Sequence, residues 1–146
     1  MQKEILLEIL KQNQFTGHFS LDRVSEENAS LRLNGGTASI GFIYRHIGET
    51  MNLFGALLGV PTDVKNTTIG QIDIGQGDDV EFSRQLISRG YNLLKDLVEN
   101  SEDEDWLKPV DTPFFGTVTP NQILCSRSFS YIESCGSDIP DISERK

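Results

Sequence analysis

The two histidines of this sequence, His18 and His46, are its best candidates for metal binding or proton transfer. His46 precedes Glu49 by three residues in a strongly apolar stretch, so both belong to one predicted helix, with His46 at the edge of its buried face. One interpretation is a metal ligand with Glu49 as the partner that holds the ring from outside the coordination sphere. The other is a boundary histidine that is hydrogen-bonded within the protein. A single histidine predicts weak metal binding, because catalytic zinc sites use about three protein ligands.

Other residues with reactive side chains give weaker signals. His18 has no acidic or cysteine neighbour nearer than Asp22, which predicts a solvated side chain. Cys125 and Cys135 form no CxxC motif, so we interpret them as small hydrophobic residues or ordinary free thiols. The segment Gly75-Gln76-Gly77 lacks the Lys-Ser/Thr pair that would follow in a phosphate-binding loop. These features predict no nucleophilic triad and no nucleotide site.

Apolar periodicity predicts the helices that position these residues. The first helix covers about 3–22, and the third runs from about Asp79 to Asn100. The second is the clearest, with Thr37 or Ser39 as its cap and an end at Gly59-Val60-Pro61. Its apolar residues form one stripe that is expected to face a core: Ile40, Ile43, Ile47, Met51, Phe54 and Leu58.

Two further segments complete the predicted architecture. The connection 62–78 is too long for a simple turn, so we expect a crossover or a functional lid. Thr119-Pro120 is a good start for a fourth helix, but the apolar pattern fails beyond Leu124. Trp106 is expected to anchor its loop onto the helices. No segment shows convincingly the alternation of apolar and polar residues that is typical of β-strands. The sequence therefore predicts an all-α fold: a four-helix bundle with a long crossover connection and a degenerate or truncated last helix.

Length and charge limit the class of protein. The 146 residues fit one domain, 1–146, of which 121–146 is an atypical C-terminal segment. Lys and Arg total 13 against 22 Asp and Glu, and the net charge of −9 argues against nucleic acid or an anionic membrane as a partner. No apolar run reaches the ~18 residues of a membrane-spanning helix. The sequence MQKEILLEIL lacks the features of a secretory signal, so we expect a cytoplasmic protein.

The stretch TASIGFIYRHIGETMNLFGALLG (37–59) resembles the DinB/YfiT-like family of four-helix-bundle proteins, and VDTPFFGTVTPNQIL (110–124) resembles that family's approach to its last helix. The resemblance implies a divalent metal, zinc or nickel, held by three histidines. One of them matches His46, and the other two form an HxxxH motif on the last helix, followed closely by Gly-Gln. It also implies homodimers and, in some members, group transfer or isomerisation with a small-molecule thiol.

This chain departs from the family pattern at its last helix. No histidine follows His46, and Ser130 and Ser134 occupy the two remaining ligand positions when Gly136 is taken as the family glycine. Residues 121–146 hold six serines, against seven in residues 1–120. One hypothesis is a shifted reading frame. If both serines are encoded TCA, reading one base later gives histidine at both positions, because the Tyr131 and Cys135 codons begin with T. The alternative is a genuine, divergent C-terminus.

Two functions remain open from the sequence. The first is a DinB-like bundle related to metal-dependent thiol transferases or hydrolases, catalytically impaired because two of three ligands are missing, with metal absent or weakly bound at His46. The second is a non-enzymatic, dimeric binding or interaction module, in which the connection 62–78 shapes a pocket or an interface.

Overall fold

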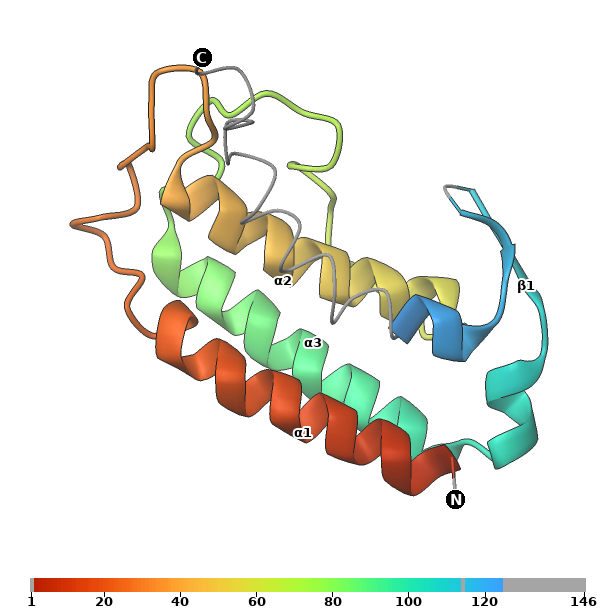
Figure 1. Cartoon of the computed structure of the whole chain (residues 1–146). Coiled ribbons are helices and arrows are strands. Elements are labelled where there is room, and N and C mark those ends of the chain that lie inside the picture. The colour runs from red at the N-terminus through yellow and green to blue at the C-terminus, as the bar shows by residue number, and fades with distance from the viewer. Residues whose placement is uncertain (1, 114, 125–146) are drawn as a thin grey trace, which may run out of the picture.

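The computed structural model describes residues 2–113 and 115–124, and this part of the chain is mostly helical with one small sheet (Figure 1). Its long helices are α1 (Gln2–Leu21), α2 (Ile40–Leu57) and α3 (Val80–Asn100). A 3-10 helix, η1 (Asp103–Leu107), leads into an antiparallel hairpin of β1 (Val110–Thr112) and β2 (Gly116–Val118). A further helix starts at Pro120 and continues through Leu124, as Thr119-Pro120 predicted. Ser130, Ser134, Gly136 and both cysteines lie outside the described residues.

The hairpin is a small sheet in a chain that is otherwise mostly helical, as predicted, and the sequence pattern did not reveal it. Val110 pairs with Val118, and Gly116 adopts φ +66°, a left-handed conformation that glycine tolerates without strain. Each strand has only three residues, which is too short for an alternating apolar pattern to be visible in the sequence. The hairpin links η1 to the start of the last helix.

The helix α3 packs against both other long helices. Figure 1 shows α2 and α3 running in the same direction and α1 running opposite to both. Neighbouring positions agree with these directions. Gly48 lies against Leu86 and Gly55 against Leu93, so α2 and α3 advance together. Along α1 the order is reversed, because Lys3 bonds to Asp103, just beyond α3, and Asn13 bonds to the earlier residue Tyr91. The two parallel helices explain the long crossover, since the chain must return along the whole of α2 before α3 can begin.

Both ends of α2 are where the sequence placed them. The Ser39 hydroxyl caps the first turn by accepting a hydrogen bond from the Phe42 amide at 3.2 Å. At the other end Gly59 has φ +92°, the left-handed conformation that commonly terminates a helix. The third helix is capped in the same way by Asp79, whose carboxylate accepts from the Phe82 amide at 2.8 Å.

The buried face of α2 differs from the predicted stripe. Met51 and Phe54 are buried as expected, but Ile40 is 37% exposed and the other three stripe residues are only half-buried. Several residues that meet α3 are instead small or polar: Arg45, Gly48, Asn52 and Gly55. Glycines bring the two helices close together here, so backbone and Cβ atoms make contacts that larger side chains would prevent.

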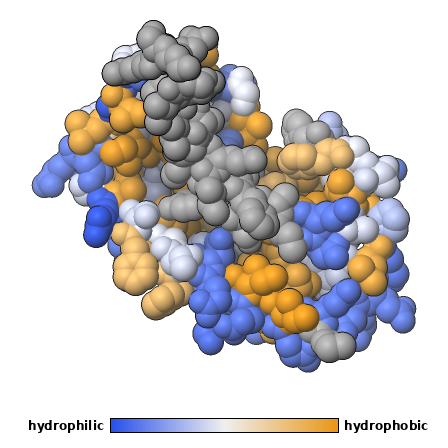
Figure 2. Space-filling view, viewed as in Figure 1, coloured by the Kyte–Doolittle hydropathy of each residue, from blue (hydrophilic) through white to orange (hydrophobic). Residues whose placement is uncertain are grey.

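The core is built from the inner faces of the three long helices, from Val24 and Ala29 of the connection between α1 and α2, and from two later residues. Trp106 of η1 is only 2% exposed, which confirms that it anchors its segment, and Leu124 of the last helix packs in the same cluster. Large apolar side chains also reach the surface along α1, as Figure 2 shows, and Phe15 and Phe19 lie edge to face with ring centroids 5.4 Å apart. Within the described residues, no helix combines the length and apolar character that crossing a bilayer requires.

Candidate functional site

The sequence-predicted site residue His46 lies on α2 and is half-buried where the crossover returns along the helix. Its Nδ1 atom is 3.1 Å from the hydroxyl oxygen of Thr68, a buried residue of the crossover. The Thr68 hydroxyl in turn donates to Oε2 of Glu49 at 2.8 Å. The structure therefore connects His46 with Glu49, as the sequence suggested, but through a threonine and not by direct contact.

Glu49 is the most enclosed carboxylate of this region, with only 2% of its surface exposed. It accepts four hydrogen bonds from two consecutive crossover residues. The amides of Thr67 and Thr68 donate to Oε2 at 2.8 and 3.0 Å, and the Thr67 hydroxyl donates to Oε1 at 2.6 Å. The fourth bond is the one from the Thr68 hydroxyl. A buried charge is tolerated when its oxygens are paired in this way, so the carboxylate fixes the crossover onto the middle of α2.

The two threonines are themselves held in place by neighbouring side chains. Oδ1 of Asn66 accepts hydrogen bonds from the amides of Thr68 and Ile69, which forms a local turn. The Gln76 amide group donates to the Thr67 carbonyl at 3.1 Å. The turn 66–69 is thus a rigid support for Glu49 and, through Thr68, for the imidazole.

A second carboxylate fixes the crossover near the start of α2. Asp73 accepts a hydrogen bond from the Ser39 amide at 2.8 Å and pairs with the Arg32 guanidinium at 2.8 Å. Burial disfavours its charge, but hydrogen bonds from Ser39 and Gly75 together with Arg32 outweigh burial and lower the pKa of Asp73. The crossover is therefore attached to α2 at two places, which favours a fixed strap over a mobile lid.

The geometry around His46 does not complete a metal centre. Among residues 2–113 and 115–124, no three His, Cys, Asp or Glu side chains lie close enough together to hold a metal ion. Within the described part of the chain, the hydrogen bonds to the Glu49 oxygens all come from Thr67 and Thr68, so these bonds tie the carboxylate to the crossover. Around His46, the described residues thus offer one imidazole as a metal ligand. One imidazole does not fit the three-ligand centre of a catalytic zinc or nickel site.

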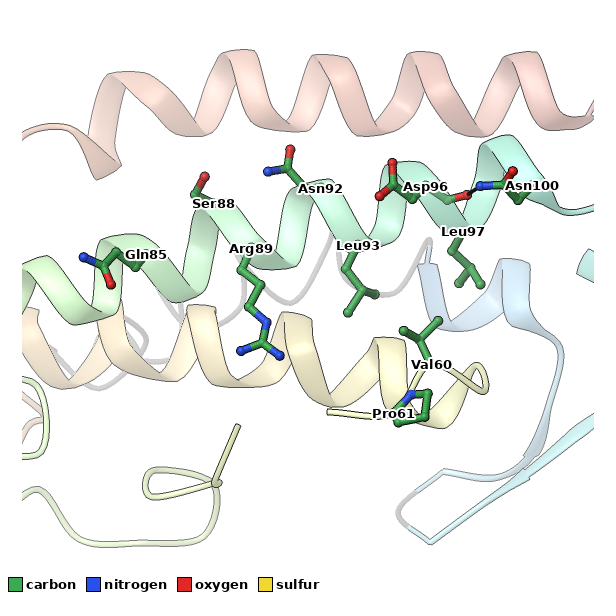
Figure 3. Close-up of a pocket in the computed structure, with 10 residues that line it drawn as sticks. All are labelled: Val60, Pro61, Gln85, Ser88, Arg89, Asn92, Leu93, Asp96, Leu97 and Asn100. Carbon is green, nitrogen blue, oxygen red and sulfur yellow. Dashed lines mark hydrogen bonds between the residues drawn. The ribbon is translucent and has the colours of Figure 1, made fainter. Parts of the chain in front are cut away.

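The remaining histidine and a groove on the surface lie elsewhere. His18 is exposed, as predicted, and its Nδ1 is 2.5 Å from Asp22. A groove of about 770 Å³ lies between α3 and Val60-Pro61. Figure 3 shows Arg89 and Leu93 pointing from α3 into the space beside α2. Arg89 is 2.5 Å from Asp63, and this guanidinium lowers the pKa of Asp63. His46 and Glu49 do not line this groove, so the groove and the candidate site are separate.

Comparison with known proteins adds no functional assignment, because no family model and no curated protein matches the sequence. The residues that sequence reasoning missed are Thr67 and Thr68. Their signal was the succession of asparagine and threonine, which favours local turns, but nothing in the spacing linked them to a carboxylate 18 and 19 residues earlier.

Proposed function

We propose that the chain is a DinB-type four-helix bundle in which His46 is the one remaining ligand of a divalent-metal centre. The helix directions support this proposal. Two parallel neighbours joined by a crossover, an antiparallel α1 and a last helix starting at Pro120 are the elements of a bundle with one long crossover connection.

The observation that carries the proposal is the hydrogen bond between His46 Nδ1 and Thr68, with a buried carboxylate behind it. Histidines that bind metal generally have their second ring nitrogen held by a carboxylate, a carbonyl or a water molecule. With a single ligand the site binds zinc or nickel weakly, and the chain as it stands is impaired as a metal-dependent thiol transferase or hydrolase.

Metal titration of the purified, tag-free protein tests this function. Because the sequence has only two histidines, His18→Ala is a matched control for His46→Ala. We expect weak Ni²⁺ or Zn²⁺ binding by calorimetry that falls at least about tenfold in His46→Ala and is unchanged in His18→Ala. Equal affinities in both variants would exclude His46 as the ligand. Metal retained by the wild-type protein during dialysis against a chelator would show that further ligands complete the site.

The exposed apolar residues favour a second candidate, a non-enzymatic module that acts as a homodimer. Phe15 and Phe19 are 60% and 59% exposed, and Ile72 and Ile74 of the crossover are more than 80% exposed. Apolar surface of this kind is common where proteins associate. Light scattering during size-exclusion chromatography should then give a dimer mass at micromolar concentration, and Phe15→Ser with Phe19→Ser should give a monomer if α1 forms the interface. A wild-type monomer would count against this candidate.

A further inference from the structure

We propose that Asn34 is a site of spontaneous deamidation, at which the backbone of the loop before α2 converts an asparagine side chain into aspartate or isoaspartate. The proposal goes beyond the proposed function and does not depend on His46. Asn34 precedes Gly35 and Gly36, and this is the one Asn-Gly pair of the sequence. All three residues are exposed, so solvent base and water can reach them.

The reaction needs only the Gly35 nitrogen, the Asn34 side chain, solvent base and water. The nitrogen loses its proton to hydroxide and attacks Cγ of Asn34, so a bond between nitrogen and Cγ forms. The bond between Cγ and Nδ2 then breaks, and Nδ2 takes up a proton from solvent and leaves as ammonia. Water opens the resulting cyclic imide at either carbonyl. One opening gives aspartate, and the other gives isoaspartate, in which the main chain runs through the former side chain.

The turn holds the reacting groups together and stabilises the charge that develops. Oδ1 of Asn34 accepts a hydrogen bond from the Gly36 amide at 2.9 Å. The ring closed by this bond includes the Gly35 nitrogen, so the side-chain carbonyl is folded back towards the atom that attacks it. During the attack Oδ1 becomes an oxyanion. The Gly36 amide is already placed to donate to that oxyanion, as backbone amides do in acyl-transfer enzymes.

The Gly35 amide is available for this attack. It donates no hydrogen bond to any residue of 2–113 or 115–124, and a Cβ atom built on Gly35 would meet no heavy atom within 4 Å. The backbone on either side is nevertheless fixed, because the Asn34 carbonyl accepts from the Thr37 amide and hydroxyl at 3.2 and 3.0 Å. Thr37 thus holds the turn without covering the nitrogen that reacts.

Asn66 lies in a similar turn and provides an internal comparison. Its Oδ1 also accepts from the amide two residues on, that of Thr68, at 3.3 Å. The nitrogen that would attack here belongs to Thr67, and it donates to the buried carboxylate of Glu49 at 2.8 Å. Attack would break that bond, and the branched threonine side chain crowds the nitrogen. We therefore expect Asn34 to deamidate at least about tenfold faster than Asn66, because small misplacements of reacting groups cost that much or more.

The reactive turn lies beside the second attachment of the crossover. Arg32 pairs with Asp73 at 2.8 Å, and its Nη1 atom donates to the Thr37 carbonyl at 2.6 Å. Isoaspartate inserts a methylene group into the backbone between Asn34 and Gly35, which separates the partners of the bonds between Asn34 and Thr37. Deamidation thus adds one negative charge to the −9 of the chain, and its isoaspartate product alters the turn that holds Arg32.

Mass spectrometry of tryptic peptides measures both asparagines in one digest. Trypsin releases residues 33–45 and 66–84, and each peptide contains a single asparagine. The folded protein is incubated at mildly alkaline pH, and conversion raises a peptide's mass because OH replaces NH2. Methyl transfer from S-adenosylmethionine by a protein isoaspartate methyltransferase measures the isoaspartate product. We expect progressive conversion in the peptide 33–45 and at least about tenfold less in 66–84. An unmodified Asn34, or equal rates at Asn34 and Asn66, would overturn the proposal.

Two variants separate the turn from the Asn-Gly sequence itself. Gly35→Ala adds a methyl group for which there is space, at a glycine whose φ is not positive, and should slow conversion of Asn34 at least about tenfold by crowding the nitrogen. Thr67→Gly creates a second Asn-Gly pair whose nitrogen still faces Glu49. Asn66 should stay slow in the folded variant. Conversion of Asn66 there as fast as that of Asn34 would show that the sequence and not the turn controls the reaction.

Unfolding in urea at the same pH shows whether the turn promotes or protects. With the Gly36 amide supporting the oxyanion, Asn34 should convert at least as fast in the folded protein as in the unfolded chain. Asn66 of Thr67→Gly should instead become as fast as Asn34 once its bond to Glu49 is lost. A folded-state rate for Asn34 well below the unfolded rate would mean that the turn protects this residue, and the proposal would be wrong.

Discussion

The close contact between α2 and α3 predicts that the same substitution, glycine to alanine, has opposite effects at two helical positions. A Cβ atom added at Gly48 would lie 2.7 Å from Leu86 Cβ and 3.2 Å from the backbone of Ser83 and Ile87. Rotation of a side chain cannot relieve these contacts, because they involve backbone and Cβ atoms. At Gly17 of α1, by contrast, the nearest atoms would be 3.4 and 3.5 Å away, which is ordinary van der Waals contact.

The expected magnitudes follow from two opposing effects. Alanine gains about 1 kcal/mol over glycine in a helix interior. At Gly17 nothing opposes this gain, so Gly17→Ala should stabilise the protein by about 0.5–1 kcal/mol. At Gly48 the added methyl is about 0.7 Å too close to Leu86, and overpacking of this kind costs about 1–3 kcal/mol. Gly48→Ala should therefore destabilise the protein by about 1 kcal/mol net.

Urea unfolding measures the difference, with Trp106 as the probe. The sequence has one tryptophan and its side chain is buried, so its fluorescence reports loss of the core. With a slope of about 2 kcal/mol per M, the midpoints of the two variants should differ by roughly 1 M urea, on opposite sides of the wild-type value. A midpoint for Gly48→Ala at or above that of Gly17→Ala would refute the close approach of α2 and α3.

Three further predictions concern the crossover, the α2 cap and the C-terminal segment. Because the pKa of Asp73 is lowered on folding, its carboxylate stabilises the protein above the ordinary pKa of about 3.9, and this contribution is lost as the pH falls through the lower folded-state pKa. The stability difference between wild type and Asp73→Asn should accordingly shrink between about pH 6 and pH 3 in urea unfolding, and a constant difference would contradict it. Ser39→Ala should lower the free energy of unfolding by about 1 kcal/mol, whereas Ser39→Asp should retain most of it; equal losses would argue against a capping role. If the reading frame is shifted, the gene encodes Ser130 and Ser134 as TCA, and sequencing that finds AGC or AGT at either position excludes the shift.

The sequence predicted the α2 limits because capping is local. Ser39 and Gly59 act within one turn of their own position, and both were recognisable from residue type. The face of α2 that packs on α3 was not predictable in the same way. Apolar periodicity finds large hydrophobic residues, whereas this interface is made by Gly48, Gly55 and Asn52.

The candidate site was predictable only in part. The spacing of His46 and Glu49 placed both on one helix, and this was confirmed. Their link through Thr68 depends on how a long connection folds back, and such a tertiary contact leaves no periodic signal. The short hairpin escaped detection for a related reason, since three-residue strands are stabilised mainly by their pairing and not by a pattern of their own.

The attachment of the crossover to Glu49 also bears on the entropy of closing the chain between two parallel helices. The contact between Asn52 and Leu86 joins residues 34 apart, whereas that between Glu49 and Thr67 joins residues 18 apart. Loop-closure entropy grows with the logarithm of loop length, so each halving of an open loop saves about 0.6 kcal/mol. Because Glu49 in the middle of α2 binds Thr67, the chain between α2 and α3 closes as two shorter loops and not as one long loop. The two parallel helices then pair in a chain whose conformational freedom is already reduced.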